Sequence, residues 1–384
     1  MSKKSILLVF VVCLLMIAAV GLTGCRSKEP VIVTPPDKEV GAAEDPSVPL
    51  IWPFTGLDSE NRLEILARPL SVKIDNHPQS GSKVGINSAD LVFENLTEGG
   101  ITRFNAIFQS NIPDEVMPVR SAREADVLII PQFGDALFFY SGSNSSVRRS
   151  IRDAGIATLE HGEIGSDLYR RVPDRRAPHN LAVDLSSAYE VAEARELKIK
   201  ADEPIKGLAF LRDDIEDTST PEESTDADAD AQEGTIEPSS DYRGASKVSI
   251  PFSPHASTQW TWDDEAKLWM RTMGGNAQYD GASDEQISTN NLVVMWAEHT
   301  PATRDTYAID LIGGGKVSVF TDGKQYDGVW EGSADAPPVF KDSAGNPILL
   351  TPGRTWISVV KTGEDISSSY DGPAASNESD NNGE

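Results

Sequence analysis

Three stretches decide the fold of the first folded region: Leu70-Ser-Val-Lys-Ile74, Asp90-Leu-Val-Phe-Glu-Asn-Leu96 and Ile101–Gln109. The first alternates apolar and polar residues, which is typical of a strand with one buried face. The other two carry β-branched and aromatic residues and also predict strands. A fourth stretch, Ala136–Tyr140, is a short apolar run that suits a buried strand.

Helix signals alternate with these strands. Ser121-Ala-Arg-Glu124 and Ser187-Ala-Tyr-Glu190 have the spacing of a capping box, and the first precedes the apolar run Val127–Ile130. A third helix is predicted from Ser145 to Ala154, with Gly155 just past its end. Residues 57–212 therefore predict an α+β (or α/β) domain built on a mixed sheet.

Residues 243–362 predict an all-β domain, a sandwich or a barrel-like fold. Asp322-Gly323 lies between two of the candidate strands and is a strong hairpin signal. Gly313-Gly-Gly315 and Ala344-Gly-Asn346 are interpreted as further turns. The candidate strands are Lys247–Pro251, Gln259–Trp262, Leu268–Thr272, Leu292–Glu298, Lys316–Thr321, Tyr326–Trp330 and Thr355–Lys361.

Tryptophan is concentrated in this second region. Six of the seven tryptophans lie there, at positions 260, 262, 269, 296, 330 and 356. Such a density indicates the core of a sandwich or barrel, and this interpretation is preferred to a carbohydrate-stacking platform.

The amino terminus carries an export signal. Lys3 and Lys4 precede an apolar run from Ile6 to Val20, and Leu22-Thr-Gly-Cys25 follows. This last motif resembles the bacterial lipobox, which implies cleavage after residue 24 and a lipid on Cys25; a plain signal peptide and a short anchor are the alternatives. Cys13 would leave with the signal, so the mature chain would have no free thiol and no cysteine chemistry.

Three segments predict disorder. Residues 25–56 are rich in proline and form a tether, residues 213–242 form an acidic linker, and residues 363–384 form an acidic tail. The formal charge of the chain is −26, of which the linker contributes −12 and the tail −6. This balance excludes a nucleic-acid-binding protein, because contacts to phosphates need a basic face. The alternating Asp of the linker is not an EF-hand, since Ala231 stands where the loop needs glycine.

Candidate site residues cluster in the first domain. Asp75-Asn76-His77-Pro78 follows a predicted strand, although the same residues also suit a simple turn. Arg120 and Arg123 lie near a predicted helix start, where they could bind phosphate, carboxylate or sulfate. The alternative is internal ion pairing, with Glu94, Glu98 or Asp126 as partners.

A second basic cluster comprises Arg170-Arg171 and Arg175-Arg176, just before His179 and Asn180. If it folds near the first cluster, an anion pocket results, with His179 as an acid or base. Ser143 and Ser145 are interpreted as a turn and helix cap, because no nucleophile elbow surrounds them. The five histidines are scattered, so neither a metal nor another cofactor is expected.

Several motifs together resemble the YerB-like family of bacterial lipoproteins. The resemblance covers nearly all of the mature folded chain and implies an exported, lipid-anchored, two-domain protein of the cell envelope. The family's domains carry no assigned biochemical function. The motifs are Arg68–Asn76, Ala89–Glu94, Glu98–Arg103, Pro118–Arg123, Pro178-His-Asn180, Trp269-Met-Arg271, Asn291–Val294, Gly313–Phe320 and Pro352–Trp356.

Three functional hypotheses follow. The first is a non-enzymatic envelope lipoprotein that binds a wall component or envelope protein through an anion cleft. The second is a hydrolase or transferase acting on a cell-wall glycan, peptide or phosphate-containing polymer, and the third is a structural scaffold. The cleft of the first hypothesis would comprise Arg103, Arg120, Arg123, Arg170, Arg175, His179 and Asn180. The catalytic residues of the second would be Asp75, Glu98 and His179, with Arg103, Arg120 and Arg123 beside them.

Overall fold

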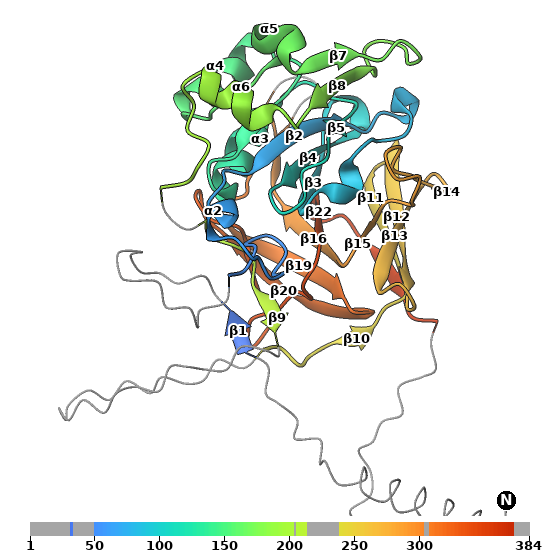
Figure 1. Ribbon diagram of the computed structural model, residues 1–384. Coiled ribbons are helices and arrows are strands. Elements are labelled where there is room, and N and C mark those ends of the chain that lie inside the picture. Colours follow the sequence, from blue (N-terminus) through green and yellow to red (C-terminus); the bar gives the residue numbers. More distant parts are fainter. Residues whose placement is uncertain (1–30, 34–49, 203–204, 213–237, 303–306, 372–384) are drawn as a thin grey trace, which may run out of the picture.

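The computed structural model describes residues 31–33, 50–202, 205–212, 238–302 and 307–371. The predicted signal peptide (1–24) and Cys25 lie outside these residues, as do most of the tether (25–56) and of the acidic linker (213–242). A 10-stranded sheet forms the centre of the molecule (Figure 1). Across this sheet the strands are β10 (Arg243–Gly244), β20 (Lys324–Gly332), β19 (Gly313–Thr321), β16 (Asn291–Ala297), β22 (Thr355–Lys361), β3 (Leu91–Leu96), β4 (Thr102–Phe108), β2 (Leu70–Asp75) and β6 (Leu137–Phe139), with β21 (Val339–Lys341) beside β20.

The two sequence regions share this sheet. Strand β22, from the second region, pairs in parallel with β3 of the first, with Thr355 opposite Leu91 and Val359 opposite Asn95. The first region contributes a mixed part of the sheet and the second contributes mostly antiparallel strands, as the sequence predicted. The regions are therefore joined by continuous backbone hydrogen bonding between strands.

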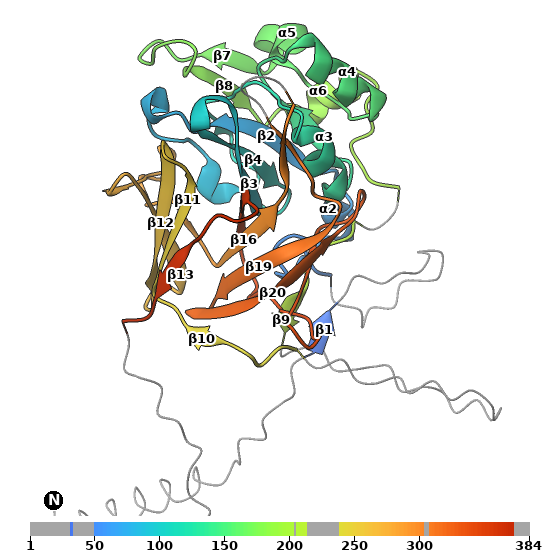
Figure 2. The same ribbon diagram turned by 180° about the vertical axis from the view of Figure 1, so that it is seen from behind.

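A six-stranded sheet of the second region packs on one face of the large sheet. Figures 1 and 2 show its strands β11, β12 and β13, in yellow, standing against the large sheet. Its buried Trp260 and Trp269 share a core with Leu292, Val294 and Trp356 of the large sheet, which gives the two-layer packing of a sandwich. Its strands are β14 (Asn276–Ala277), β13 (Leu268–Met273), β12 (Ala256–Asp263), β11 (Lys247–Ser253), β23 (Ser367–Ser369) and β15 (Ser288–Thr289).

The helices of the first region are short, and most of them gather at one end of the large sheet together with a three-stranded sheet, while the helix of residues 62–65 lies apart from them (Figure 1). The α-helices are α2 (Arg62–Ile65), α3 (Asp126–Ile129), α4 (Ser145–Asp153), α5 (His161–Ile164) and α6 (Ala188–Ala194). The small sheet contains β5 (Glu115–Val116), β8 (Leu181–Asp184) and β7 (Tyr169–Arg171). Two further strand pairs are β1 (Val31–Val33) with β9 (Phe210–Arg212), and β17 (His299–Pro301) with β18 (Tyr307–Ile309). Every helix among the described residues is too short or too polar to span a membrane.

Several local predictions are confirmed. Strand β22 has the predicted bounds, and Asp322-Gly323 forms a two-residue hairpin loop between Thr321 and Lys324. Both loop residues have positive φ, of 48° and 68°, as a type I′ turn requires. Helix α4 ends before Gly155, which has a φ of 69°. Of the second region's tryptophans, all but Trp262 are buried core residues: Trp260, Trp269, Trp296, Trp330 and Trp356.

Other predictions are wrong. Ser121 caps no helix: α3 begins at Asp126, its N-cap is Ala125, and no side chain caps it. Gly313-Gly-Gly315 is the beginning of β19 and not a turn. The first part of the predicted tail is ordered, because Ser367–Ser369 pairs with β11. Within the predicted tether, Phe54 is fully buried in the core.

Candidate functional site

The candidate site lies at one edge of the large sheet. Strand β4 is antiparallel to both β2 and β3, while β22 pairs in parallel with β3. Strands β2, β3 and β22 therefore point the same way, and their carboxyl ends meet at a common edge, where sheet proteins often place ligands. Asp75 is the last residue of β2 at this edge, and Glu98 follows β3. Arg103 is the second residue of β4 and lies opposite Asp75.

Asp75 is a buried carboxylate with three partners. It accepts a hydrogen bond from the backbone N–H of His77 at 3.0 Å, and its second oxygen lies 2.6 Å from Nδ1 of His179 and 3.1 Å from Nε of Arg120. Burial alone would raise the pKa of Asp75, but the bonds from His77 and His179 and the charge of Arg120 outweigh it and lower the pKa. The Asp75 carboxylate is therefore an anion stabilised by its contacts with His77, His179 and Arg120.

Glu98 is the second carboxylate of the site. Its Oε1 lies 2.6 Å from Nη2 of Arg103, and its Oε2 accepts a 2.6 Å bond from Nε of Arg123. Arg123 Nη2 also bonds to Oε1 of Glu98, which makes the contact a fork-like pair. Partial burial raises the pKa of Glu98, yet the bond from Arg123 and the charge of Arg103 prevail and lower the pKa to about 2.

Backbone groups hold the arginines in place. Segment 118–123 is attached to β2, because Asp75 donates its N–H to Pro118 and Arg120 donates its N–H to Lys73. Arg103 also donates from Nη1 to the carbonyl of Ser121 at 3.0 Å. Three guanidinium groups thus share two carboxylates, which leaves one excess positive charge even with His179 neutral. We call Asp75, Glu98, Arg103, Arg120 and Arg123 the arginine cluster.

Arg120, Arg123 and Glu98 remain accessible at their side chains, with exposed fractions of 24%, 17% and 30%. Arg103 is almost fully buried. Burial and the neighbouring charge of Arg123 lower the pKa of Arg103 to about 10, so it stays charged at neutral pH. Arg120 and Arg123 therefore expose positive charge to solvent, while Arg103 is buried.

His179 stands beside the cluster with its side chain 12% exposed. Its ring stacks on that of His77, with centroids 5.0 Å apart and 22° between the ring planes. His77 accepts the N–H of Gln79 at Nδ1, so its own proton resides on Nε2 when the ring is neutral. A carboxylate that hydrogen-bonds the Nδ1 of a histidine is the arrangement that orients a general base.

Three residues predicted for the site lie outside the cluster. Arg170 is exposed and pairs with Glu115, with 2.5 Å between Nη2 and Oε2. Arg175 donates from Nη1 to the carbonyls of Ser80 and Ser82, beside the turn that follows Asp75. Asn180 accepts from Arg171 at 2.8 Å. These contacts of the second basic cluster hold loops in place, and none of them is to Arg120 or Arg123.

Buried charges in strands complete the surroundings of the site. Lys73 lies on the same face of β2 as Asp75 and makes a fully buried 2.6 Å ion pair with Asp126. On the other face, Glu94 pairs with Arg271 of the six-stranded sheet. Sequence reasoning missed Lys73 and Arg271 as pairing residues, although a charge inside an apolar strand is a usable signal, since buried charges need partners.

Metal-binding residues are not grouped in the described part of the chain. Three or more His, Cys, Asp or Glu side chains in a metal-binding arrangement do not occur there. Ser143 and Ser145 flank Asn144, whose side chain accepts from Val147 and caps α4. The loop is thus a helix start, as the sequence predicted.

Comparison with known proteins places these features in a family. Residues 54–198 match the N-terminal domain described as "Protein of unknown function (DUF3048)", and residues 248–357 match the corresponding C-terminal domain. The chain belongs to the DUF3048 family. Both the arginine cluster and His179 lie within the N-terminal DUF3048 domain, whereas Arg271 lies in the C-terminal DUF3048 domain.

A curated relative covers most of the chain. The protein named "Putative lipoprotein YerB" of Bacillus subtilis (strain 168) is 28% identical over 324 residues, which are 83% of this chain and 88% of the relative. The crystal structure of the YerB protein from Bacillus subtilis superimposes with a TM-score of 0.69 and 26% identity. That superposition covers 84% of this chain and all of the other. This chain thus shares its fold with that solved structure over most of its length.

Proposed function

We propose that this protein is a lipoprotein held on the extracytoplasmic face of the cell membrane through Cys25. Two observations support this: the motif Leu22-Thr-Gly-Cys25 resembles a lipobox, and the relative from Bacillus subtilis is named as a lipoprotein. A lipid on Cys25 would supply membrane attachment without a spanning helix.

The anchor is tested by Cys25→Ser. The variant should appear in the soluble or secreted fraction, while the unaltered protein stays with membranes and incorporates labelled palmitate. Cys13→Ser is the matched control, because that cysteine precedes the predicted cleavage site and should change nothing. Tight membrane retention of Cys25→Ser would contradict the lipoprotein assignment.

We further propose that the arginine cluster binds an anionic ligand of the cell envelope, a phosphate or carboxylate group. The observation that carries this is the sharing of two carboxylates by three guanidinium groups, with Arg120 and Arg123 partly exposed. Nη1 and Nη2 of Arg120 have no hydrogen bond among the described residues, whereas Arg123 already donates to Glu98, Ser121 and Ala122. An oxyanion could therefore accept chiefly from Arg120, with Arg123 adding its charge, and such charge-assisted bonds are the stronger class of hydrogen bond. Structural pairing alone would need only one arginine for each carboxylate.

A thermal-shift screen tests the anion site. Glycerol 3-phosphate, inorganic phosphate and acetate should raise the unfolding midpoint of the unaltered protein, with an effect that grows roughly with the logarithm of their concentration, while neutral glycerol should have a smaller effect. Arg120→Ala/Arg123→Ala should remove the response. Arg170→Ala is the matched control, because Arg170 is an exposed, paired arginine outside the cluster. An unchanged response in the double variant would favour a purely structural role for the ion pairs, as in an envelope scaffold.

A second candidate function is hydrolysis or group transfer on a wall polymer. The specific observation is the 2.6 Å contact between the buried Asp75 carboxylate and Nδ1 of His179. In this arrangement Asp75 would orient the ring, Nε2 of His179 would take a proton from water or a hydroxyl group, and Arg120 would hold an anionic group of the substrate. The arginine cluster would then be the substrate-binding part of an enzyme.

This candidate is tested by turnover. The purified protein is incubated with peptidoglycan, teichoic acid and phosphodiester model substrates, and released products are measured. Activity that falls by about 10²–10⁴-fold in both His179→Ala and Asp75→Asn would support general-base catalysis. Absence of turnover, together with anion binding in the thermal-shift screen, would favour anion binding without catalysis as the function.

A further inference from the structure

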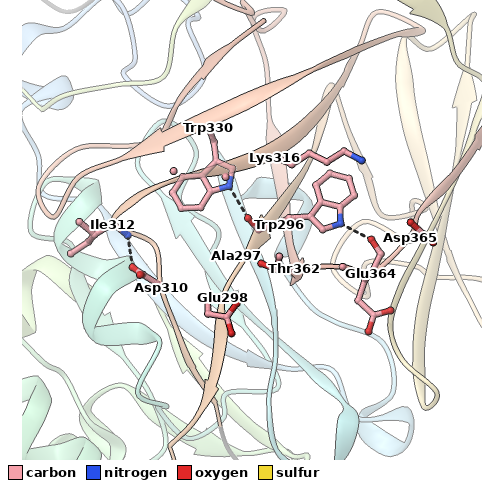
Figure 3. A pocket seen from close by; sticks show the side chains of 13 residues that line it. Trp296, Ala297, Glu298, Asp310, Ile312, Lys316, Trp330, Thr362, Glu364 and Asp365 are labelled. Carbon is pink, nitrogen blue, oxygen red and sulfur yellow. Dashed lines mark hydrogen bonds between the residues drawn. The ribbon is translucent and has the colours of Figure 1, made fainter. Parts of the chain in front are cut away.

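A cavity of about 350 Å³ opens at the other half of the same sheet edge (Figure 3). It lies past the carboxyl ends of the parallel neighbours β16 and β22 and beside the beginning of β19. Residues after β16 and β22 form one side, where open sheets have room for ligands. Gly314 and Gly315 of β19 form another.

Two glycines of β19 lie in close contact with tryptophan atoms at the cavity wall. A Cβ atom on Gly315 would come within 2.5 Å of the carbonyl oxygen of Trp296 and 2.8 Å of Nε1 of Trp330. A Cβ on Gly314 would come within 2.7 Å of the carbonyl oxygen of Trp330. The strand therefore approaches the two tryptophans as closely as a backbone can, which only glycine allows.

Two indole rings form the wall, and their N–H groups are already used. Trp296 donates from Nε1 to the carbonyl of Glu364 at 2.6 Å, and Trp330 donates to the carbonyl of Trp296 at 2.9 Å (Figure 3). Both rings are largely buried, so they offer little flat surface to a sugar. The wall is rigid and aromatic, with no free donor on either indole.

A cation already contacts this wall. Nζ of Lys316 lies 4.4 Å from the centroid of the Trp296 ring, within the range of a cation–π contact. Lys316 is exposed, and in the part of the chain that is described no carboxylate lies within ion-pair distance of it. The protein's own ammonium group thus marks a position where the site accepts a positive charge.

Four carboxylates surround the cavity: Glu298, Asp310, Glu364 and Asp365. Against the single charge of Lys316 they give the lining a net charge of −3. Among the described residues none of the four forms an ion pair, and Asp310 only accepts the N–H of Ile312 at 3.0 Å. The carboxylates are spread around the rings and do not converge on a metal-sized point.

We propose that this cavity binds an organic cation with a primary ammonium group. The ammonium would replace Nζ of Lys316 on the face of Trp296. No carboxylate of the described residues is within ion-pair distance of that position, so the rim would attract the cation through its net negative charge. Lys316 is an exposed lysine on a flexible stem, so it can leave the ring without disturbing the fold. This site is opposite in charge to the arginine cluster and independent of it.

Titration with cadaverine (1,5-diaminopentane) tests the proposal in the folded chain, with tryptophan fluorescence and calorimetry as readouts. Saturable binding is expected for cadaverine and not for 1,5-pentanediol, its neutral counterpart. Glu298→Gln/Asp310→Asn should weaken binding by about fivefold or more, and Lys316→Met should tighten it by about threefold or more, because it removes the internal competitor.

Two control variants separate this site from general charge attraction and from the arginine cluster. Glu163→Gln removes an exposed acid on α5 and should leave cadaverine binding unchanged. Arg120→Ala/Arg123→Ala should also leave it unchanged, so that failure of the anion site and failure of the cation site are distinguishable. The proposal is overturned if pentanediol binds as tightly as cadaverine or if Lys316→Met weakens cadaverine binding. It is also overturned if Glu163→Gln loses as much cadaverine affinity as Glu298→Gln/Asp310→Asn.

Discussion

Glu94 of β3 and Arg271 of β13 form an ion pair whose side chains are both fully buried, with Nη2 2.8 Å and 3.0 Å from the carboxylate oxygens. Thr102 and Trp356 also donate to Glu94, at 2.7 Å and 3.0 Å. The guanidinium carbon lies 5.0 Å from the Trp356 ring and 5.3 Å from the Phe104 ring. The pair therefore joins the two sequence regions between the packed sheets.

Loss of one partner of this pair should strongly destabilise the fold. Arg271→Met leaves a buried carboxylate without its counter-charge, which is expected to cost about 3–5 kcal/mol in the free energy of unfolding. Urea denaturation followed by circular dichroism measures it. Lys198→Met, at a surface pair with Asp202, is the control and should change stability by about 0.5 kcal/mol or less. Equal effects of the two substitutions would show that the buried pair is not important for stability.

The stabilising contribution of Glu98 should be lost at acid pH. Its pKa is lowered from 4.5 to about 2 by Arg123 and Arg103, which outweigh the effect of burial, so the folded state binds its proton less well than the unfolded state. Its contribution is complete above about pH 4.5 and is lost as the pH falls toward 2. Unfolding free energies measured across this range should fall less steeply in Glu98→Gln. A slope identical to that of the unaltered protein would be evidence against the pairing.

Lys83 should make the free energy of unfolding depend on pH in the alkaline range. Burial, and then the charge of Arg271, lower its pKa from 10.5 to about 7, while Nζ donates to Ser80 Oγ at 2.9 Å and to the carbonyl of Gly81 at 3.0 Å. The unfolded state binds this proton more tightly, so stability should rise between about pH 7 and 10.5. In Lys83→Met that rise should be reduced. Denaturation at pH 7, 8.5 and 10 measures it, and an undiminished rise would contradict the assignment.

Gly315→Ala should disturb the approach of β19 to the tryptophans. The added methyl group would collide with the backbone of Trp296 and with the Trp330 ring, and overpacking of this kind costs about 1–3 kcal/mol. Gly162→Ala is the matched control, since its nearest contact would be an ordinary 3.5 Å. Thermal unfolding of the two variants is the measurement. Similar midpoints would mean that the strand has room to move.

Local features of the fold were predictable because they depend on neighbouring residues. Strand β22 and the Asp322-Gly323 turn follow from short-range pattern and backbone preference. The predicted capping box at Ser121 is wrong because backbone hydrogen bonds hold segment 118–123 along β2, and the helix begins only at Asp126. The turn predicted at Gly313–Gly315 is wrong because glycine allows the strand to approach the distant Trp330, and sequence spacing does not show that contact.

Contacts between distant segments were beyond local pattern. That β22 lies beside β3 depends on the packing of the whole chain, and so does the pairing of Glu94 with Arg271. Glu98 was among the predicted partners of Arg120 and Arg123, and it pairs with Arg123. Arg120 pairs with Asp75, which sequence reasoning placed at a strand end without its partner. Arg170, Arg175 and Asn180 were grouped with the cluster because they precede or follow His179 in sequence, although they serve other contacts.

Anion binding by the arginine cluster is tested most directly by measuring the affinity for glycerol 3-phosphate with isothermal titration calorimetry. The unaltered protein should bind it, more weakly at high salt because the charges are partly exposed. Arg120→Ala/Arg123→Ala, measured below its unfolding midpoint, should lose about tenfold or more of the affinity, while Arg170→Ala should retain it. Equal affinity in the double variant and the unaltered protein would contradict anion binding by the arginine cluster.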